Sequence, residues 1–483
     1  MNLLKDAMDG NKPVYLIGIK GTGMCALAEL LQGAGMRVSG SDTADTFYTD
    51  AILRELKIPF HEGFAVEQVP ARALVIHSAA WTDANNVEAA EAVRRGQELL
   101  SYTEALGAYS ALFDAAGIAG VHGKTTTTAL AGALTAALKL PAQVLAGSAI
   151  SSFGGRCTLQ QGSRFFIAET CEYRRHFLAF KPRRIVLTSV ESDHQDYYPD
   201  YASIRDAFCE YVSLLPPEGL LIYCADESGA CEVAASALAR GIQTAPYGFS
   251  AQGPWRLEYV ECADERLRFK VAAFDQEFAL RIPGTHNALN AAGALALIYS
   301  LYATWHGELS VSLQDSFAEK AVQAFEDFRG SKRRAEVLGE AQGVLFIDDY
   351  GHHPTAIMAT LKGIKAFYPT RRLVVSFMPH TYSRTAALLD EFAHAFSCAD
   401  SVILHKIYPS AREKEIQGVD GRALYERTRR CHPQVIYVDD PANLAAVDSI
   451  IKQGEGGGIF LTLGAGDNWK LGRALYEQYR RDI

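Results

Sequence analysis

The sequence predicts an α/β protein of three domains, and two observations support that prediction. Its 483 residues are about three times the length of a typical domain. Short apolar runs alternate with helical runs, and many of the apolar runs end in glycine or polar residues. This order is typical of doubly wound parallel sheets, whose ligands bind at the carboxyl ends of the strands.

Composition and charge exclude several other classes of protein. Apolar residues make up 48% of the chain and charged residues 21%, as in soluble globular proteins. The net charge of −9 argues against a nucleic-acid partner, which would need a basic face. The nine cysteines are scattered and form no C-x-x-C pair, which indicates free thiols in a reducing compartment. No signal peptide is evident, and no apolar run approaches the ~18 residues of a membrane span. We therefore expect a cytoplasmic protein without membrane insertion.

The stretch GIAGVHGKTTTT, residues 117–128, predicts a phosphate-binding loop. An apolar strand leads into Gly120, Gly123 and Lys124, and a helical run follows at 129–138. Glycines let backbone amides approach phosphate oxygens, Lys124 supplies a charge for the β- and γ-phosphates, and the Thr125 hydroxyl can bind magnesium. The strict G-x-x-x-x-G-K-[ST] pattern fails because residue 118 is Ile, but the core G-x-x-G-K-T is present. The alternative is an ordinary turn with an exposed lysine.

A second glycine-rich turn follows the first predicted strand, residues 14–19. Gly18, Gly21 and Gly23 precede a helical run at 24–31, and a short strand at 36–39 leads to Ser41 and Asp42. An acidic residue about twenty positions after such glycines suits a ribose hydroxyl, so a nicotinamide-dependent dehydrogenase is the default interpretation. A purely structural turn is the alternative. A further strand at 73–77 leads to Ser78, and the alternation continues to about residue 112.

Two acidic clusters follow apolar strands after the phosphate loop. The first, at 164–172, places Glu169 at the end of its strand, and the second, at 184–196, contains Asp193 and His194. Carboxylate and imidazole groups at strand ends, facing Thr125, make a plausible magnesium shell. The alternatives are an exposed strand-end charge for Glu169 and a loop histidine bonded to Asp193 for His194.

The rest of the chain adds antiparallel strands, a helix start and another doubly wound domain. Residues 255–282 alternate like antiparallel strands, and PGTHNALN at 283–290 opens a helix in which Asn290 could either read an adenine edge or belong to a cap. A boundary is predicted near 326–331. The strands beyond it, at 344–347, 373–377, 401–404 and 458–463, each lead to polar or glycine residues. For the adjacent pairs at 348–349 and 352–353 we favour hydrogen-bonding roles over a metal, because neighbouring residues point apart on an extended chain.

These motifs resemble the Mur ligase family, the ATP-dependent amide-forming enzymes of peptidoglycan precursor synthesis. The resemblance covers essentially the whole chain. It rests on GIKGTGM (18–24), SGSD (39–42), GVHGKTTTT (120–128), AETCE (168–172), ESDHQDYY (191–198), GTHNALN (284–290), RR (333–334), DDYGHHPT (348–355), PHTYSRT (379–385) and GAGD (464–467). The motifs at 348–355 and 379–385 point to the member of the family that adds L-alanine.

The resemblance implies a fold, a reaction and a division of labour. It implies N- and C-terminal Rossmann-like domains, residues 1–112 and 326–483, around a central P-loop domain, residues 113–325. The first would bind the UDP-sugar, the second ATP, and the third the amino acid. The reaction would join L-alanine to the lactyl carboxylate of UDP-N-acetylmuramate through an acyl phosphate, with ATP as co-substrate and two Mg²⁺ ions. The protein would act as a monomer or homodimer, and its domains would close during catalysis.

The resemblance also assigns the site residues, and its UDP-sugar site replaces the dehydrogenase interpretation. ATP would contact Gly120, His122, Gly123, Lys124, Thr125, Thr126, Asn290, Arg333 and Asp349. The UDP-sugar would contact Gly18, Gly21, Gly23, Met24, Ser41, Asp42 and Ser78. Metal ligands would be Thr125, Glu169 and His194, and His352, His380 and Arg384 would line the cleft for the carboxylate and the amino acid. Catalysis would depend on Lys124, His194, His352 and Arg384.

The sequence departs from the usual family motifs at four places. Thr170-Cys171 replaces Ala-Asp, Thr188-Ser189 replaces Thr-Asn, Thr381 replaces the first arginine of PHRYSRT, and residues 408–413 replace YAAGE. The last two concern the amino-acid pocket. The nearest rival function is a sister ligase that attaches a preformed peptide to the same UDP-sugar. More distant rivals are a dehydrogenase with an accessory ATPase and a non-catalytic nucleotide-gated scaffold.

Overall fold

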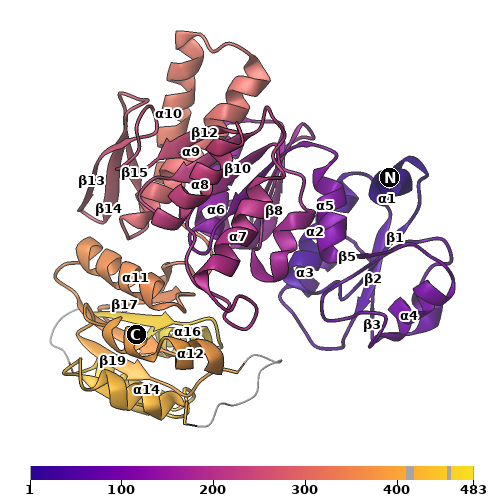
Figure 1. Cartoon of the computed structure of the whole chain (residues 1–483). Helices are drawn as coiled ribbons and strands as arrows, with labels where there is room; N and C mark the ends of the chain where they lie inside the picture. The colour runs from indigo at the N-terminus through magenta and orange to yellow at the C-terminus, as the bar shows by residue number, and fades with distance from the viewer. Residues whose placement is uncertain (1, 410–417, 454–457, 482–483) are drawn as a thin grey trace. The chain divides into compact units, whose positions relative to one another are not determined.

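The computed structural model describes residues 2–409, 418–453 and 458–481, and these fold into two compact units (Figure 1). The first unit comprises Met1–Glu191, Ala202–Arg256 and Ala291–Ala324, and the second comprises Ser192–Tyr201, Leu257–Asn290 and Phe325–Ile483. Each unit contains mainly parallel sheet joined by helices. The α/β fold class predicted from the sequence is confirmed.

The N-terminal region of the first unit is a five-stranded parallel sheet in the order β3-β2-β1-β4-β5. All four residues of its central strand β1 are buried, as expected for a parallel sheet covered on both faces. The strands are β1 Val14–Ile17, β2 Val38–Asp42, β3 Phe60–Glu62, β4 Leu74–His77 and β5 Leu99–Ser101. The helices are α1 Leu3–Asp9, α2 Thr22–Gly33, α3 Thr49–Glu55, α4 Val87–Arg94 and α5 Tyr102–Ser110, with a 3₁₀ turn η1 at Val66–Gln68.

The central sheet of the first unit has seven strands in the order β12-β11-β10-β6-β9-β7-β8, and only the edge strand β8 is antiparallel to its neighbour. The strands are β6 Asp114–Ala119, β7 Ala142–Ile150, β8 Arg156–Gln160, β9 Phe165–Glu169, β10 Arg184–Leu187, β11 Leu220–Cys224 and β12 Gln243–Tyr247. The connecting elements are α6 Lys124–Leu138, η2 Ser151–Phe153, η3 Tyr173–Ala179, α7 Tyr201–Val212 and α8 Ser228–Ala239. Because β6 lies between β9 and β10, the loop that follows β6 is flanked by the ends of both strands.

The predicted antiparallel strands form a separate sheet, β13-β14-β15, with bounds Leu257–Ala263, Arg266–Val271 and Glu277–Leu280. Two long helices follow, α9 His286–His306 and α10 Val311–Asp327. By length and composition α9 could cross a membrane, but 67% of its apolar window is buried within the protein. Core helices pass the same test, so this helix gives only weak evidence for a membrane span.

The C-terminal sheet in the second unit has the order β16-β17-β21-β18-β19-β20, with β16 antiparallel and the others parallel. Its strands are β16 Glu336–Ala341, β17 Val344–Asp349, β18 Arg372–Phe377, β19 Ser401–Leu404, β20 Val435–Tyr437 and β21 Gly458–Leu463. Its helices are α11 Pro354–Phe367, α12 Tyr382–Ala387, α13 Leu389–His394, α14 Gly421–Thr428, α15 Leu444–Ile451 and α16 Asn468–Arg481. The departure at 408–413 falls largely on residues 410–417, which lie outside the described residues.

The domain boundaries after residues 112 and 325 stay predictions. The first two sheets belong to one compact unit because the β8 edge packs on α2. Arg156 forms ion pairs with Glu29 at 2.8 Å and Glu55 at 2.6 Å, and the Gln160 amide donates to the Glu29 carbonyl at 3.1 Å. The three mainly parallel sheets are therefore separate in strand pairing. The first two nevertheless pack together in one compact unit.

A fully buried lysine shapes the turn between β1 and α2. The Lys20 ammonium donates to the carbonyls of Thr43 and Asp45 at 3.0 Å each. It also lies 3.5 Å from an oxygen of Asp50 and 3.7 Å from one of Glu62. A buried charge is tolerated only when it is paired and hydrogen-bonded, and these four groups supply both conditions. Lys20 thereby fixes the loop after β2 beside the glycine-rich turn.

We expect Lys20→Met to destabilise the protein by about 3–5 kcal/mol, because it removes the closer and buried cation of the Asp50 carboxylate and leaves only the exposed Arg54, 4.0 Å away. The measurement is the free energy of unfolding from chemical denaturation. Lys12→Met is the matched control: its ion pair with Glu98 is about one-third exposed on both sides, so its loss should cost less than about 1 kcal/mol. Equal losses in the two variants would contradict a structural role for Lys20.

Candidate active site

The loop between β6 and α6 has the backbone geometry of a phosphate cradle. Gly120 has φ +139°, and a Cβ there would lie 2.0 Å from the Thr188 hydroxyl and 2.8 Å from the Ser189 nitrogen. Gly123, at the N-cap of α6, has φ +84°, and no side chain caps the helix. The first amides of α6 are therefore left to a ligand, which is how helix N-termini bind anions. Thr126 is buried in the first turn.

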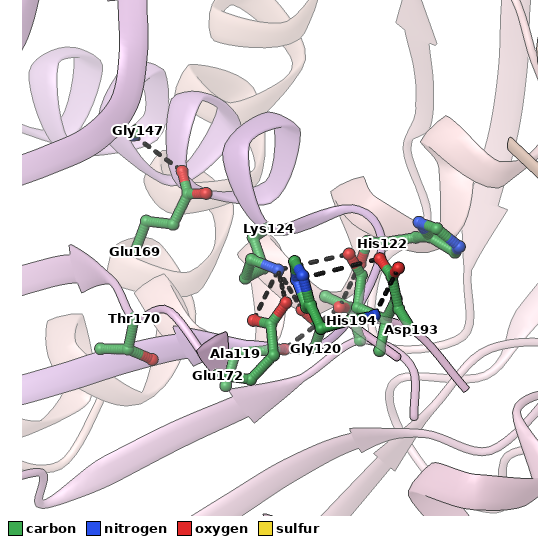
Figure 2. A network of polar contacts seen from close by, with 12 residues as sticks. Ala119, Gly120, His122, Lys124, Gly147, Glu169, Thr170, Glu172, Asp193 and His194 are labelled. Carbon is green, nitrogen blue, oxygen red and sulfur yellow. Dashed lines mark hydrogen bonds and ion pairs between the residues drawn. The ribbon is translucent and has the colours of Figure 1, made fainter. Parts of the chain in front are cut away.

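Lys124 is held in this loop by three acceptors (Figure 2). Its ammonium donates to the carbonyls of Gly120 and Val121, the second at 3.2 Å, and lies 2.8 Å from a carboxylate oxygen of Glu172. Burial lowers the pKa of Lys124, but Glu172, Cys171 and Glu169 outweigh it and raise the pKa above its ordinary value. The side chain therefore stays charged in a nearly buried site.

Glu169, the last residue of β9, joins the loop to the neighbouring strand β7. One carboxylate oxygen accepts from the Thr125 hydroxyl at 3.0 Å. The other accepts from the Gly147 amide at 2.7 Å (Figure 2). A Cβ on Gly147 would lie within 2.8 Å of the carboxylate, so a side chain there would displace it. The structure thus brings together two of the three predicted metal ligands, Thr125 and Glu169.

The residues after β10 support the loop from the other side. The Thr188 hydroxyl donates to the Ala119 carbonyl at 3.1 Å and to the His122 carbonyl. The Ser189 hydroxyl accepts from the His122 amide at 2.9 Å, and the Ser189 carbonyl accepts from the Val121 amide at 3.0 Å. Thr188 and Ser189, which stand in place of the family's Thr-Asn, therefore both form side-chain hydrogen bonds to the loop.

The glycine-rich turn of the N-terminal sheet is built around close contacts. Gly18 has φ +84°, and a Cβ there would lie 2.5 Å from the Ser78 hydroxyl. Gly21 is the N-cap of α2, and a Cβ on Gly23 would lie 3.0 Å from the Tyr102 ring. Met24 is buried in α2, with 3% of its surface exposed. Gly18 and Ser78, predicted from separate segments of the sequence, are thus adjacent.

Ser41 and Asp42 bind the protein itself. The Ser41 hydroxyl donates to the fully buried carboxylate of Glu88, which also accepts from Tyr15 at 3.1 Å. Burial raises the pKa of Glu88. Its hydrogen bonds lower the pKa, but their effect is smaller than that of burial. The Asp42 carboxylate accepts from the amides of Lys20 at 2.7 Å and Thr43 at 2.8 Å. Asp42 therefore shapes the glycine turn, and the side chain of Ser41 faces the interior.

A cavity of about 310 Å³ lies within the first unit. Thr22 and Gly23, which follow the first glycine-rich turn, line it together with Glu169, whose carboxylate contacts Thr125 of the phosphate loop. Tyr102, Cys171, His176, Phe177 and Phe180 contribute to its walls. A ligand that reaches from the first turn toward the phosphate loop would fit this arrangement.

The second unit contains a buried ion pair at the predicted carboxylate cleft. The Arg384 guanidinium lies 2.9 Å from the Asp193 carboxylate, and both side chains are less than 10% exposed. Burial would raise the pKa of Asp193, but Arg384, His194 and His352 hold it well below its usual range. Burial, with Arg384 nearby, lowers the pKa of His352 well below its ordinary value, so its imidazole is neutral. Arg384 and His352 thus lie close enough to interact electrostatically, and the cleft that they would line stays a prediction.

His194 and Thr381 both adopt left-handed backbone conformations. His194 has φ +55°, its amide donates to Asp193 at 2.7 Å, and its ring lies 3.9 Å from the same carboxylate. Thr381 has φ +71° and its hydroxyl caps α12 by accepting from the Arg384 amide at 3.4 Å. His380 pairs with Tyr408 through an isolated bridge. His194 is therefore bonded to Asp193, which is the contact expected if it is an ordinary loop histidine.

The predicted nucleotide contacts of the second unit are held by hydrogen bonds within that unit. Arg333 bonds to Asp348 at 3.1 Å and to the Gly464 carbonyl at 2.6 Å. Asp349 accepts from the amides of Ala335 and Gly351, both at 2.7 Å. The Asn290 amide donates to Asn287 at 3.1 Å inside α9. The hydrogen-bonding roles favoured for the aspartate pair are present, and the ligand contacts of Arg333, Asp349 and Asn290 stay predictions.

Sequence reasoning missed three residues that matter for the site and its sheet: Glu172, Ser189 and Glu88. Glu172 belongs to the motif at 168–172, and its position at the end of the β9 segment was a usable signal. Ser189 was recognised only as a departure from the family. Glu88 gave no signal, because its burial depends on Tyr15 and Ser41, which lie far from it in the sequence.

The fold and the loop define a class of protein, the α/β nucleotide-binding proteins with a phosphate loop. Comparison with known families narrows this class. Residues 13–114 match the Mur ligase family catalytic domain, residues 118–298 the Mur ligase middle domain, and residues 333–466 the Mur ligase glutamate ligase domain.

Individual proteins agree with these matches. The chain is 50% identical to UDP-N-acetylmuramate–L-alanine ligase of Treponema pallidum (strain Nichols), covering 97% of each chain. It is 34% identical to the protein of the same name from Borreliella burgdorferi, covering 97% of this chain and 99% of the other. The crystal structure of UDP-N-acetylmuramate–alanine ligase from Thermotoga maritima superposes with a TM-score of 0.74 at 24% identity, covering 98% and 100%. The chain belongs to the Mur ligase family.

A carboxylate near the phosphate loop is perturbed toward neutrality. Glu227 stands at the start of α8, and burial, with the carboxylates of Glu191 and Asp226, raises its pKa from 4.5 to about 7. The folded protein favours the protonated form of Glu227. The stability that Glu227 contributes is therefore fully present below pH 4.5 and is lost as the pH rises through 7.

We therefore expect Glu227→Gln to stabilise the protein by an amount that grows from pH 5 to pH 8. The gain at pH 8 should be roughly 1–2 kcal/mol, smaller than the full pKa shift implies, because the side chain is partly exposed. Thermal unfolding at the two pH values measures it. Glu218→Gln, which removes an exposed partner of Arg183, should give no such difference. An equal effect of Glu227→Gln at both pH values would contradict the raised pKa.

Proposed function

We propose that this chain is an ATP-dependent ligase that adds L-alanine to the lactyl carboxylate of UDP-N-acetylmuramate in peptidoglycan precursor synthesis. The observation that carries the proposal is the phosphate loop, in which Lys124 and Thr125 face the carboxylates at the end of β9. The substrates come from the relatives, of which the Treponema pallidum protein is 50% identical over 97% of the chain. We place the enzyme in the cytoplasm as a monomer or homodimer.

In the proposed reaction the substrate carboxylate attacks the γ-phosphorus of ATP, and ADP leaves. The resulting acyl phosphate is attacked by the amine of L-alanine, which loses a proton as inorganic phosphate departs and the amide forms. Lys124 would neutralise charge on the transferred phosphoryl group, and the α6 amides would orient the phosphates. Such positioning and charge stabilisation account for most of catalysis in phosphoryl transfer.

Thr125 and Glu169 fit a magnesium ion. A hydroxyl and a carboxylate oxygen 3.0 Å apart are hard oxygen donors, and Mg²⁺ commonly binds through one or two protein oxygens together with substrate phosphates. When bound, the ion would neutralise the β- and γ-phosphate oxygens. We also propose a second Mg²⁺ ion, held by His194, so that the site would bind two ions in total.

The second unit would supply the groups for the carboxylate and the amine. Arg384 is oriented by its buried pair with Asp193, so its guanidinium is fixed before substrate binds. His352 is neutral and half-buried, and its Nδ1 lies 3.0 Å from the Tyr350 carbonyl, which assigns the proton to that nitrogen. Its other ring nitrogen is then an acceptor that could receive a hydrogen bond from the incoming amine.

With UDP-N-acetylmuramate present, we expect L-alanine to support the fastest ADP release, with glycine and L-serine slower. One methyl or hydroxyl group changes transition-state binding by only about 1–3 kcal/mol, so the neighbours should react at reduced rates. A coupled assay of ADP release across a panel of amino acids measures this. A tripeptide included in the panel tests the sister ligase, and its preference over L-alanine would overturn the proposal.

The acyl-phosphate route predicts where one carboxylate oxygen goes. The amide keeps one oxygen of the lactyl carboxylate, so the other must leave in inorganic phosphate. If that carboxylate is labelled with heavy oxygen, mass spectrometry of the released phosphate should find the label there. The labelled substrate incubated with enzyme but without ATP, in parallel, controls for exchange of the label with water. Label in AMP would mean an adenylate mechanism, in which the reacting centre is the α-phosphorus and neither Lys124 nor Glu169 acts on the γ-phosphoryl group.

A further inference from the structure

The contact between Lys124 and Glu172 has a consequence for nucleotide binding. An ammonium group has three N–H donors. Three acceptors already surround that of Lys124: the carbonyls of Gly120 and Val121 and the carboxylate of Glu172. A phosphate oxygen can therefore bind this nitrogen only by replacing at least one of them.

The geometry identifies which acceptor is replaced. The carbonyls of Gly120 and Val121 belong to the loop itself, and the Val121 backbone is fixed by its bond to Ser189. Losing either carbonyl would mean remodelling the cradle that the phosphates enter. Glu172 is the anion among the three acceptors, and its carboxylate occupies the place that an anionic phosphate would take.

Glu172 is itself held firmly. It follows β9 closely at the N-cap of η3, its side chain is 3% exposed, and its carbonyl accepts from the Arg175 amide at 2.8 Å. The preceding carboxylate of the segment, Glu169, binds the next residue of the loop, Thr125. Two carboxylates from one strand end thus hold two consecutive residues of the phosphate loop, Lys124 and Thr125.

We propose that Glu172 is a positioning residue that holds Lys124 in the nucleotide-free protein and competes with nucleotide phosphates for its ammonium. Binding of ATP or ADP transfers the lysine from Glu172 to the phosphates, and departure of the nucleotide returns it. Glu172 keeps the lysine charged and the empty loop folded, at the expense of affinity for nucleotide. The inference rests on the proposed function only in requiring that the loop bind a nucleotide.

The test is the dissociation constant of ADP, measured by calorimetry on the full chain. Glu172→Gln keeps the shape of the side chain and removes its charge, so it should bind ADP on the order of tenfold more tightly, a change of about 1.4 kcal/mol. AMP lacks the phosphates that Lys124 would contact, so its affinity should stay unchanged. Glu172→Asp, whose shorter side chain withdraws the carboxylate, should bind ADP several-fold more tightly; it tests the same point if the glutamine variant does not fold.

A double-mutant cycle separates this role from general repulsion of anions. In a Lys124→Met background, Glu172→Gln should leave the affinity for ADP unchanged, because no ammonium remains to be released. Simple removal of a negative charge would instead raise the affinity in both backgrounds. Glu218→Gln, an exposed carboxylate in the same unit, is the matched control and should have no effect.

The outcomes are distinct. Unchanged or weaker ADP binding in Glu172→Gln and Glu172→Asp, or a gain that persists with Met at position 124, would overturn the role of Glu172. Failure of the unaltered protein to bind ADP at all would overturn the proposed function instead. Unfolding temperatures of the variants, recorded alongside, establish that each is folded when its affinity is measured.

Discussion

The site depends on the attachment of one loop to the ends of two flanking strands. The segment from Gly120 to Thr125 follows β6, and β9 and β10 are the neighbours of that strand in the sheet. The end of β9 contributes the two carboxylates, and the residues after β10 contribute two hydroxyls. Because both strands pair with β6 in fixed register, the strand order of the sheet determines the shape of the loop.

The same attachments impose an electrostatic constraint. Glu169 and Glu172 both contact the loop that is proposed to bind the nucleotide phosphates, and carboxylates repel phosphate oxygens. A cation must therefore lie between Glu169 and the phosphates, since Thr125 offers only a neutral hydroxyl. For Glu172, the ammonium of Lys124 is the cation that balances the carboxylate charge. The need for magnesium thus follows from the groups that hold the loop together, in addition to the chemistry of phosphoryl transfer.

The sequence predicted the parts of the fold and site that depend on local pattern. Several apolar strands, such as β1 and β18, lie within a few residues of their predicted bounds, and helices follow both glycine-rich turns, but the nine-residue strand β7 was not predicted. The edge strands β3 and β20 were missed because three residues, such as Phe60–Glu62, carry too little periodicity. The Ser41 hydroxyl binds Glu88 across 47 residues, a contact that no local pattern contains, and the place of Ser41 in the UDP-sugar site stays a prediction.

At two places where the sequence departs from the family motifs, the substituted side chain makes a hydrogen bond to the backbone. Ser189, in place of asparagine, still offers an acceptor to the His122 amide. Thr381, in place of arginine, accepts from the Arg384 amide and so defines the start of α12. That exchange removes one positive charge beside Arg384, whose own charge is already balanced by Asp193. Hydrogen bonds to the backbone are therefore present at both places. If Arg384 binds the substrate carboxylate as proposed, it does so as the single arginine of the motif at 379–385.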